Sequence, residues 1–367
     1  MPEYKWKPIE DLPENLYSYS DSNLRKLEEE WKELKSTISD DIQKSILDEI
    51  KRQWAIETGK VEGLYTLSKG ITETFIKDGI QADIIREEST NRGPKLVGAM
   101  ILDQEEVLEG LFDVVAHRKE LTLSYIKSMH QVFTRHQDLT EAVTSEGKII
   151  NIPLLKGDWK RESNSPLQND KTIHEYCPPL QVQNEMEKLF GLYLRHKELN
   201  LAPEVRAAFL HHRFTQIHPF QDGNGRIARA LASLIFICEG DFPLVVNDDE
   251  RSEYFSILEY ADFNNIRPLI DFMVNKQKDL LYSVIKRAKE EEFKKNLSLF
   301  ETRVDTYIDD FSTLKEQVNS SNAILNMWKD SLYEIVGSYE EKLKEKGLLQ
   351  DSVISHVSAG SRQVSTS

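Results

Sequence analysis

The sequence has few cysteines, no long hydrophobic run and fewer basic than acidic residues. Its 367 residues include only Cys177 and Cys238, which supply neither a disulfide framework nor a cysteine metal cluster. The longest apolar run, at 231–238, is interrupted by Ser233 and is far shorter than the roughly 20 residues of a membrane-spanning helix. With 47 Lys and Arg against 62 Asp and Glu, the net charge of -15 disfavours broad contact with nucleic acid or anionic membranes. Residues 1–10 lack the apolar segment of a signal peptide, so we expect a soluble, cytoplasmic protein without a membrane partner.

Helical periodicity covers most of the chain. Apolar residues recur at spacings of three and four in 24–54, 105–136 and 183–289, which is the pattern of amphipathic helices. The turn cluster Asn91 to Pro94 should break the helices on either side of it. Glycines and prolines between 137 and 179, interleaved with short apolar runs, predict loop and hairpin structure. We therefore expect an all-α fold with a small β-hairpin.

A heptad pattern marks the C-terminal part of the sequence. Apolar and aromatic side chains occupy every seventh position from Val304 to Tyr339, and a companion series runs from Phe300 to Ile335. Two interpretations fit: additional C-terminal helices that pack within the chain, with a turn at 319–322, or a coiled coil between copies of the chain. The Ser-rich tail at 355–367 has the composition of a disordered segment.

The segment from His218 to Arg229 has the composition of an anion-binding turn. It reads His-Pro-Phe-Gln-Asp-Gly-Asn-Gly-Arg-Ile-Ala-Arg. Gly223 and Gly225 flank Asn224, so the backbone can turn tightly and bring its N–H groups close to a ligand. A helical pattern follows at once, which places the turn at a helix N-terminus, where free N–H groups and the dipole attract anions.

The side chains around this turn suit phosphate chemistry. Arg226 and Arg229 lie one helical turn apart and offer forked donors for phosphate oxygens. Asp222, at the mouth of the turn, is an oxygen ligand of the kind that holds Mg²⁺ against phosphates. His218 has an ordinary pKa near neutrality and could take a proton from an attacking hydroxyl. These residue types predict phosphoryl or nucleotidyl transfer without indicating which phosphorus is attacked.

The same segment resembles the motif of the Fic family, His-x-Phe-x-(Asp/Glu)-Gly-Asn-Gly-Arg-x-x-Arg, at all eight specified positions. The resemblance implies the mainly helical Fic fold and a protein adenylyltransferase, which moves AMP from ATP to a Ser, Thr or Tyr hydroxyl of a target protein. It makes His218 the base, Asp222 the Mg²⁺ ligand and Arg229 the partner of the γ-phosphate. It assigns nucleotide binding to six residues of the motif: Asp222, Gly223, Asn224, Gly225, Arg226 and Arg229.

Segments on both sides of this motif resemble further parts of the family. Residues 157–164 are similar to the start of its flap, which binds the target by strand addition and would span about 157–177 here. Lys160 stands where arginine is commoner, and Asn164 matches the flap asparagine, which we assign to the nucleotide site.

Downstream, the segments at 251–254 and 258–262 resemble the family's adenosine cover. The resemblance places Tyr254 and Asp262 near the base or ribose. Core packing would explain Tyr254 equally well.

The N-terminal helical region carries a pattern that resembles the family's inhibitory helix. Thr58-Gly-Lys-Val-Glu62-Gly63 fits Ser/Thr-x-x-x-Glu-Gly/Asn, within a helix expected at about 54–64. The resemblance implies that Glu62 pairs with Arg229 and blocks a productive γ-phosphate position. The alternative is a solvated glutamate at a helix end. In some relatives this glutamate orients a water that removes AMP, so a deAMPylase or bifunctional enzyme is an alternative.

The sequence therefore predicts four regions: an N-terminal helical region (1–93), a Fic core (94–275), a C-terminal helical or coiled-coil extension (276–354) and the tail (355–367). An alternative of another class is a nucleotide-sensing adaptor, although such a protein needs neither His218 nor Asp222. Self-modification and a homo-oligomer are further expectations. A nucleic-acid partner is disfavoured because the C-terminal segment balances acidic and basic residues.

Overall fold

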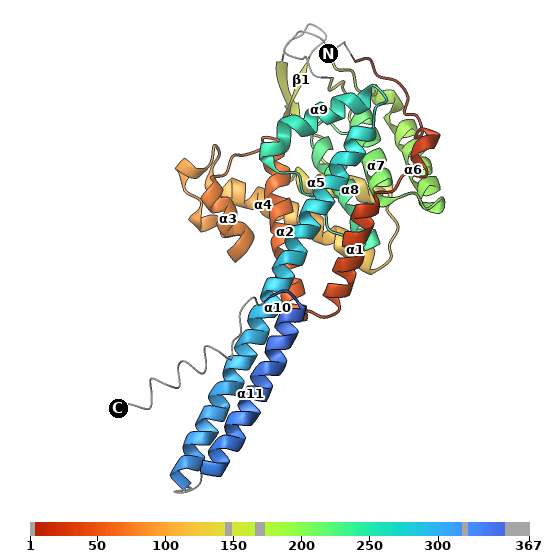
Figure 1. The fold of residues 1–367 in the computed structure, drawn as a ribbon. Helices are drawn as coiled ribbons and strands as arrows, with labels where there is room; N and C mark the ends of the chain where they lie inside the picture. Colours follow the sequence, from red (N-terminus) through yellow and green to blue (C-terminus); the bar gives the residue numbers. More distant parts are fainter. Residues whose placement is uncertain (1–3, 144–148, 166–172, 318–321, 349–367) are drawn as a thin grey trace. The chain divides into compact units, whose positions relative to one another are not determined.

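The described part of the chain folds mainly into α-helices, as the sequence predicts (Figure 1). The computed structural model describes residues 4–143, 149–165, 173–317 and 322–348. The helices within these ranges are α1 (Ser22–Lys35), α2 (Asp40–Val61), α3 (Lys69–Asp78), α4 (Pro94–Ala116), α5 (Leu123–Phe133), α6 (Val182–Glu198), α7 (Pro203–Ile217), α8 (Asn224–Glu239), α9 (Arg251–Asp262), α10 (Arg267–Gln317) and α11 (Asn322–Glu345). One antiparallel hairpin joins β1 (Leu139–Val143) to β2 (Ile149–Pro153).

The chain divides into two compact units, Met1–Glu292 and Phe293–Ser367, and α10 runs across their boundary. Within the first unit, α7 and α8 pack against each other at the centre (Figure 1). Pro203 begins α7, where a missing N–H costs nothing, and Gly240 ends α8 in the left-handed conformation. Almost every side chain of both helices is buried, so the loop between them is held on a rigid base.

Helix α2 is fixed against α8 and ends at a glycine. The indole of Trp54 donates to Ser233 Oγ on α8 at 3.0 Å. At its C-terminal end, Gly63 N–H bonds to Lys60 O and Leu64 N–H bonds to Gly59 O, which is a Schellman motif with Gly63 in the left-handed conformation (φ 68°). The glycine of the Glu-Gly pair therefore terminates the helix, and the preceding residue becomes its C-cap.

Residues 4–12 form an extended strap along α6 and α7, for which the sequence gives no signal. Tyr4 OH accepts a bond from Gln216 Nε2 at 3.0 Å, and Glu185 Oε2 accepts from the main chain of Ile9 at 2.7 Å. Tyr4 also accepts a main-chain bond from Glu175 at 3.1 Å. The strap thus holds the end of α7 and the segment that precedes α6.

The predicted hairpin is present, but it lies upstream of the segment that resembles the flap. Strands β1 and β2 pair from Leu139↔Pro153 to Val143↔Ile149. Within 157–177, residues 166–172 lie outside the described residues, and the others form no strand longer than a single bridge at Ile173. The alternating apolar run at Ile149–Pro153 forms the second strand instead.

In the second unit, α10 and α11 form a helical hairpin (Figure 1). The rings of Phe300 and Tyr339 lie 5.6 Å apart, and those of Tyr307 and Trp328 lie 5.9 Å apart. The heptad positions therefore meet within one chain, while association between copies stays a prediction. The turn at 318–321 and the tail at 355–367 lie outside the described residues.

Both cysteines are free: Cys177 is buried and Cys238 is exposed. Over the ranges that the structure describes, none of the helices has the length and apolar character required to cross a bilayer.

Candidate active site

The turn between α7 and α8 is shaped by its own asparagine. Asn224 Oδ1 accepts from Phe220 N at 2.9 Å, and Asn224 Nδ2 donates to Phe220 O at 2.8 Å. Gly223 has φ 79°, a conformation that favours glycine. Because the buried side-chain amide of Asn224 is bonded to the main chain of Phe220, it stabilises the turn and is not free to bind a ligand. The main-chain N–H of Asn224, at the first position of α8, is the group that can face an anion.

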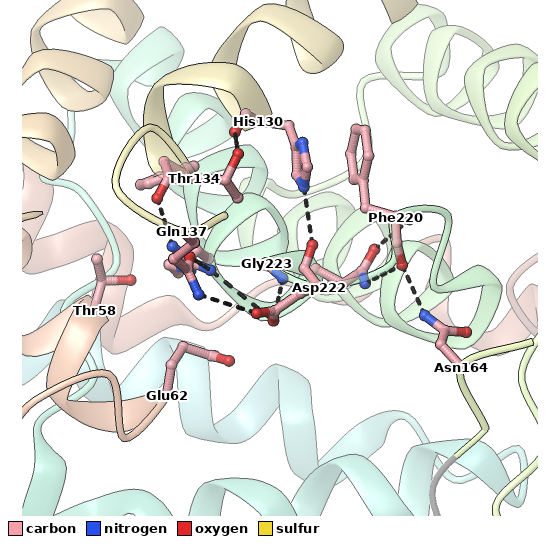
Figure 2. Close-up of polar contacts among 12 residues, drawn as sticks. Thr58, Glu62, His130, Thr134, Gln137, Asn164, Phe220, Asp222 and Gly223 are labelled. Atoms are coloured by element: carbon pink, nitrogen blue, oxygen red, sulfur yellow. Dashed lines mark hydrogen bonds and ion pairs between the residues drawn. The ribbon is translucent and has the colours of Figure 1, made fainter. Parts of the chain in front are cut away.

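Asp222 lies at the open edge of the turn (Figure 2). Its Oδ1 accepts from Gly223 N at 2.5 Å and its Oδ2 accepts from Gln137 Nε2 at 3.1 Å. Its main-chain carbonyl accepts from His130 Nε2 at 2.9 Å. The side chain is 37% exposed, so a carboxylate remains available to a cation beside bound phosphates. No group of three or more His, Cys, Asp or Glu suited to a metal occurs in the described part of the chain.

Arg226 is buried beneath the turn. Its Nη1 donates to Phe133 O at 2.6 Å and its Nη2 donates to Gln137 Oε1 at 2.7 Å. Burial lowers the pKa of Arg226 from its ordinary value, with Asp222 acting in the opposite direction. The guanidinium thus supplies positive charge under the turn and joins it to the end of α5.

Arg229 carries the predicted contact with the N-terminal helix. Its Nη1 donates to Glu62 Oε1 at 2.7 Å, and its Nε and Nη2 donate to Thr58 Oγ1 and Thr58 O, each at 2.8 Å. Burial alone would lower the pKa of Arg229, but the Glu62 carboxylate and the Tyr254 hydroxyl together outweigh burial, and the pKa is raised. The predicted pairing of Glu62 with Arg229 is therefore present, and Thr58 completes it.

The Glu62 carboxylate also lies against the first turn of α8. A Cβ placed on Gly225 would collide with Glu62 Oε1, so only glycine admits the carboxylate at this position. Glu62 is 21% exposed at its side chain and is held at the helix N-terminus where a phosphate would be attracted. Its negative charge thus occupies the place that the turn offers to an anion.

The Gly63→Ala substitution should weaken this arrangement. A residue with a Cβ at φ 68° costs about 1 kcal/mol, so we expect a lower unfolding temperature by a few degrees and a less firmly held Glu62. Calorimetry checks the first effect. Gly70→Ala on the surface of α3, where a Cβ meets nothing within 4 Å, is the control and should not lower the unfolding temperature.

His218 ends α7 in an unusual backbone conformation. Its φ and ψ are 52° and 59°, the left-handed region that residues other than glycine rarely occupy. Its Nδ1 lies 3.1 Å from Thr215 O, so Nδ1 carries the proton and Nε2 is left as an acceptor. The ring stacks on Tyr176 with centroids 3.7 Å apart. Burial, aided by the charge of Lys160, lowers the pKa of His218 to about 3, so the imidazole is a neutral base at physiological pH.

Of the three other predicted site residues, two lie beside histidines of α7 and one is bonded to the turn. Tyr254 is buried, and its hydroxyl lies 2.7 Å from His211 Nε2, which is the core packing that the sequence left as an alternative. Asp262 Oδ1 lies 2.9 Å from His212 Nε2, and its Oδ2 lies 3.6 Å from His174 Nε2. Asn164 Nδ2 donates to Phe220 O at 2.7 Å and so supports the turn from outside (Figure 2).

Four residues of the site did not emerge as site residues from the sequence. Gln137 bridges Asp222 and Arg226, and His130 stacks on Phe220 with centroids 3.9 Å apart. The other two are Tyr176 and Thr58. Only Thr58 left a signal, as the first position of the inhibitory-helix pattern, because the others act through tertiary contacts.

Residues 120–236 match the sequence profile of the Fic/DOC family. A Caenorhabditis elegans protein adenylyltransferase, fic-1, is 25% identical over 60% of this chain and 38% of the relative. The Drosophila persimilis protein adenylyltransferase Fic is 36% identical over 48% of this chain and 31% of the relative. The matched part thus spans about a third of the length of these relatives.

Solved structures share the fold. A Fic domain containing signaling protein from Bacteroides thetaiotaomicron superposes with a TM-score of 0.60 at 24% identity, covering 73% of this chain and 97% of that one. Fic-1 from C. elegans gives a TM-score of 0.57 at 20% identity, covering 73% and 72%. These likenesses show the helical fold around the site.

Proposed function

Because the chain belongs to the Fic family, we propose that it transfers AMP from ATP to a hydroxyl of a target protein. The observation that carries this proposal is the placement of His218. Its unprotonated Nε2 lies on the same turn as a helix N-terminus with Asp222 and two buried arginines. A neutral base beside an anion site is what transfer of a phosphorus group to a hydroxyl requires.

The reaction balances with these residues. The target hydroxyl gives its proton to His218 Nε2 while its oxygen forms a bond to the α-phosphorus of ATP. The bond from that phosphorus to the bridging oxygen breaks, and pyrophosphate leaves. The N-terminus of α8 and the charge of Arg226 and Arg229 stabilise the phosphate oxygens. A Mg²⁺ held by Asp222 would neutralise charge on the phosphates.

The resting state is held by Glu62. Its carboxylate takes one of the donors of Arg229 and lies against Gly225 at the helix N-terminus. ATP can place its γ-phosphate at Arg229 only after the Glu62 carboxylate moves. Both groups are negatively charged, so they would repel each other if they shared this arginine. The chain as it stands should therefore have low transferase activity.

Labelled ATP tests the proposal. The chain is incubated with a candidate protein mixture and ATP labelled at the α-phosphate, and protein-bound label is measured. Incorporation that depends on His218 supports transfer. Because Glu62 is held beside the turn and could orient water, release of AMP from a modified protein is assayed as well. If the chain only released AMP, deAMPylation would replace transfer as its function.

The pH dependence should show that His218 is not an ordinary histidine. Its pKa is lowered to about 3, so nearly all of the imidazole stays unprotonated between pH 7 and pH 5. We expect the AMP transfer rate of an activated variant to fall less than about threefold over this range, whereas a base of pKa ~6.5 would fall about 25-fold.

Initial rates with α-labelled ATP at constant ionic strength measure this, with circular dichroism as a check on folding. The check is needed because burial also lowers the pKa of His130, to about 4, so the unfolded chain binds more protons below pH 6.5 and stability decreases as the pH falls. A rate that followed a pKa near 6.5 in the folded protein would contradict the assignment.

A further inference from the structure

We propose that Lys160 is a positioning residue, which holds the main chain on both sides of His218 and so keeps the base in its strained, productive conformation. The inference rests on the proposed function, because it assigns Lys160 to the same turn. Lys160 belongs to the segment at 157–164 that precedes the undescribed residues, and it is 3% exposed.

The contacts of Lys160 surround His218 in the chain. Lys160 Nζ donates to Ile217 O at 3.4 Å, just before His218. Lys160 N donates to Pro219 O at 2.8 Å, just after it. One residue therefore binds the carbonyls that flank the base, one with its side chain and one with its main chain.

A second residue continues this clamp. Lys160 Nζ donates to Asn164 Oδ1 at 2.7 Å, and Asn164 Nδ2 donates to Phe220 O at 2.7 Å. The orientation of the Asn164 amide is thus fixed by the ammonium on one side and by the turn on the other. Figure 2 shows the bond from Asn164 to Phe220. Lys160 thus binds two peptide carbonyls around the base, those of Ile217 and Pro219, and it reaches a third, that of Phe220, through Asn164.

The backbone of His218 needs such support. A histidine at φ 52° and ψ 59° is less stable than in the right-handed region, and such conformations persist only where the surroundings determine them. The Thr215 carbonyl fixes the ring, but it lies in α7 itself and does not fix the turn. The clamp from the 157–164 segment is the external constraint, because it joins the end of α7 to the start of the turn.

The same lysine also acts on the ring. Its Nζ lies 5.7 Å from the centre of the Tyr176 ring, and Tyr176 stacks on His218. The positive charge of Lys160 lowers the pKa of His218, which favours the neutral base. Lys160 therefore connects backbone position, ring stacking and protonation state.

The choice of lysine has a consequence for pH dependence. The titratable groups that face Lys160 are His218 on the turn, and Tyr176 and Cys177 on the segment before α6, with Glu185 of α6 beyond Cys177. In the described ranges no carboxylate forms an ion pair with it. Burial lowers the pKa of Lys160 to about 7, so the clamp loses its charge as the pH rises through neutrality. An arginine at this position would keep its charge.

Kinetics in the Glu62→Gly background test the proposal, with Lys160→Met, Lys160→Arg and, as a matched control, Lys156→Met. Lys156 lies in the same stretch but bonds to Arg135 O and Asp138, away from the turn. We expect Lys160→Met to lower kcat by about 10- to 100-fold while KM for ATP changes less than about threefold, because the base is displaced and the phosphate site is intact. Lys160→Arg should restore kcat to within about threefold, and Lys156→Met should leave it unchanged.

The pH profile separates positioning by charge from simple packing. The kcat of the protein with Lys160, divided by the kcat of the Lys160→Arg variant, should fall as the pH rises from 6 to 8.5. A flat ratio, an unchanged kcat in Lys160→Met, or a KM for ATP that rises as much as kcat falls would overturn the proposal.

Crystal structures of Lys160→Met and Lys160→Arg provide a readout that does not depend on activity. His218 should leave the left-handed region in the first and keep it in the second, and retention of that conformation in Lys160→Met would overturn the clamp. If the Glu62→Gly protein transferred no AMP, adenylyl transfer would be wrong, while these two structures would still decide the role of Lys160.

Discussion

The Glu62→Gly variant is expected to incorporate AMP on the order of 10 to 100 times faster than the wild-type chain. The carboxylate makes a charge-assisted bond to buried Arg229, and such bonds contribute about 1.5–3 kcal/mol. Its removal frees one donor for the γ-phosphate and takes away a negative charge from the N-terminus of α8. The fold should survive, because Arg229 keeps both bonds to Thr58.

Two glutamine variants make this result specific. Glu62→Gln keeps the shape of the side chain and loses its charge, so its activity should lie between wild type and Glu62→Gly. Glu109→Gln removes a different carboxylate, one that pairs with Lys51 on α2 rather than with Arg229. It should behave as wild type. Initial rates of label transfer measure all three, and equal rates for wild type and Glu62→Gly would show that Glu62 does not restrain the enzyme.

The His218→Ala substitution, made in the Glu62→Gly background, should lower the rate of AMP transfer by about 10²- to 10⁴-fold. The variant loses the imidazole Nε2 that we propose takes the hydroxyl proton, while the phosphate site remains. We therefore expect ATP to bind with nearly unchanged affinity, which calorimetric titration can measure. Loss of rate without loss of binding is the signature of a residue that acts in the transition state.

A second histidine serves as the control. His117 is exposed at the end of α4, where its Nδ1 lies 2.8 Å from Asp113 O, and His117→Ala should keep the full rate. If His218→Ala retained more than about a tenth of the rate, general base catalysis by this residue would be excluded. If it lost ATP binding as well, His218 would be a structural part of the turn.

Short sequence patterns were sufficient to predict the parts of the site whose conformation depends on neighbouring residues in the chain. The glycines at 223 and 225 and the helical pattern after them predicted a turn at a helix N-terminus, and the structure has it, with α8 beginning at Asn224. The Glu62–Arg229 contact was predicted through a family pattern. The structure supplies its reason, because the following glycine ends α2 and leaves Glu62 as the C-cap residue.

Contacts between distant segments could not be read in this way. The sequence does not show that the Asn224 amide is satisfied by Phe220, or that Tyr254 is buried against His211. The N-terminal strap has no periodicity, since an extended segment bonded to side chains of α6 and α7 leaves none. The sequence did not predict the contacts of Lys160; it showed only a lysine where the family more often has arginine.

The most direct test of the account compares two labels in the Glu62→Gly protein. ATP labelled at the α-phosphate should leave label on protein, and ATP labelled at the γ-phosphate should leave none, with equal release of pyrophosphate. The protein-bound α-label and the pyrophosphate release should both disappear when His218→Ala is added. Label transferred from the γ-phosphate, or label from the α-phosphate that persists without His218, would contradict adenylyl transfer by this turn.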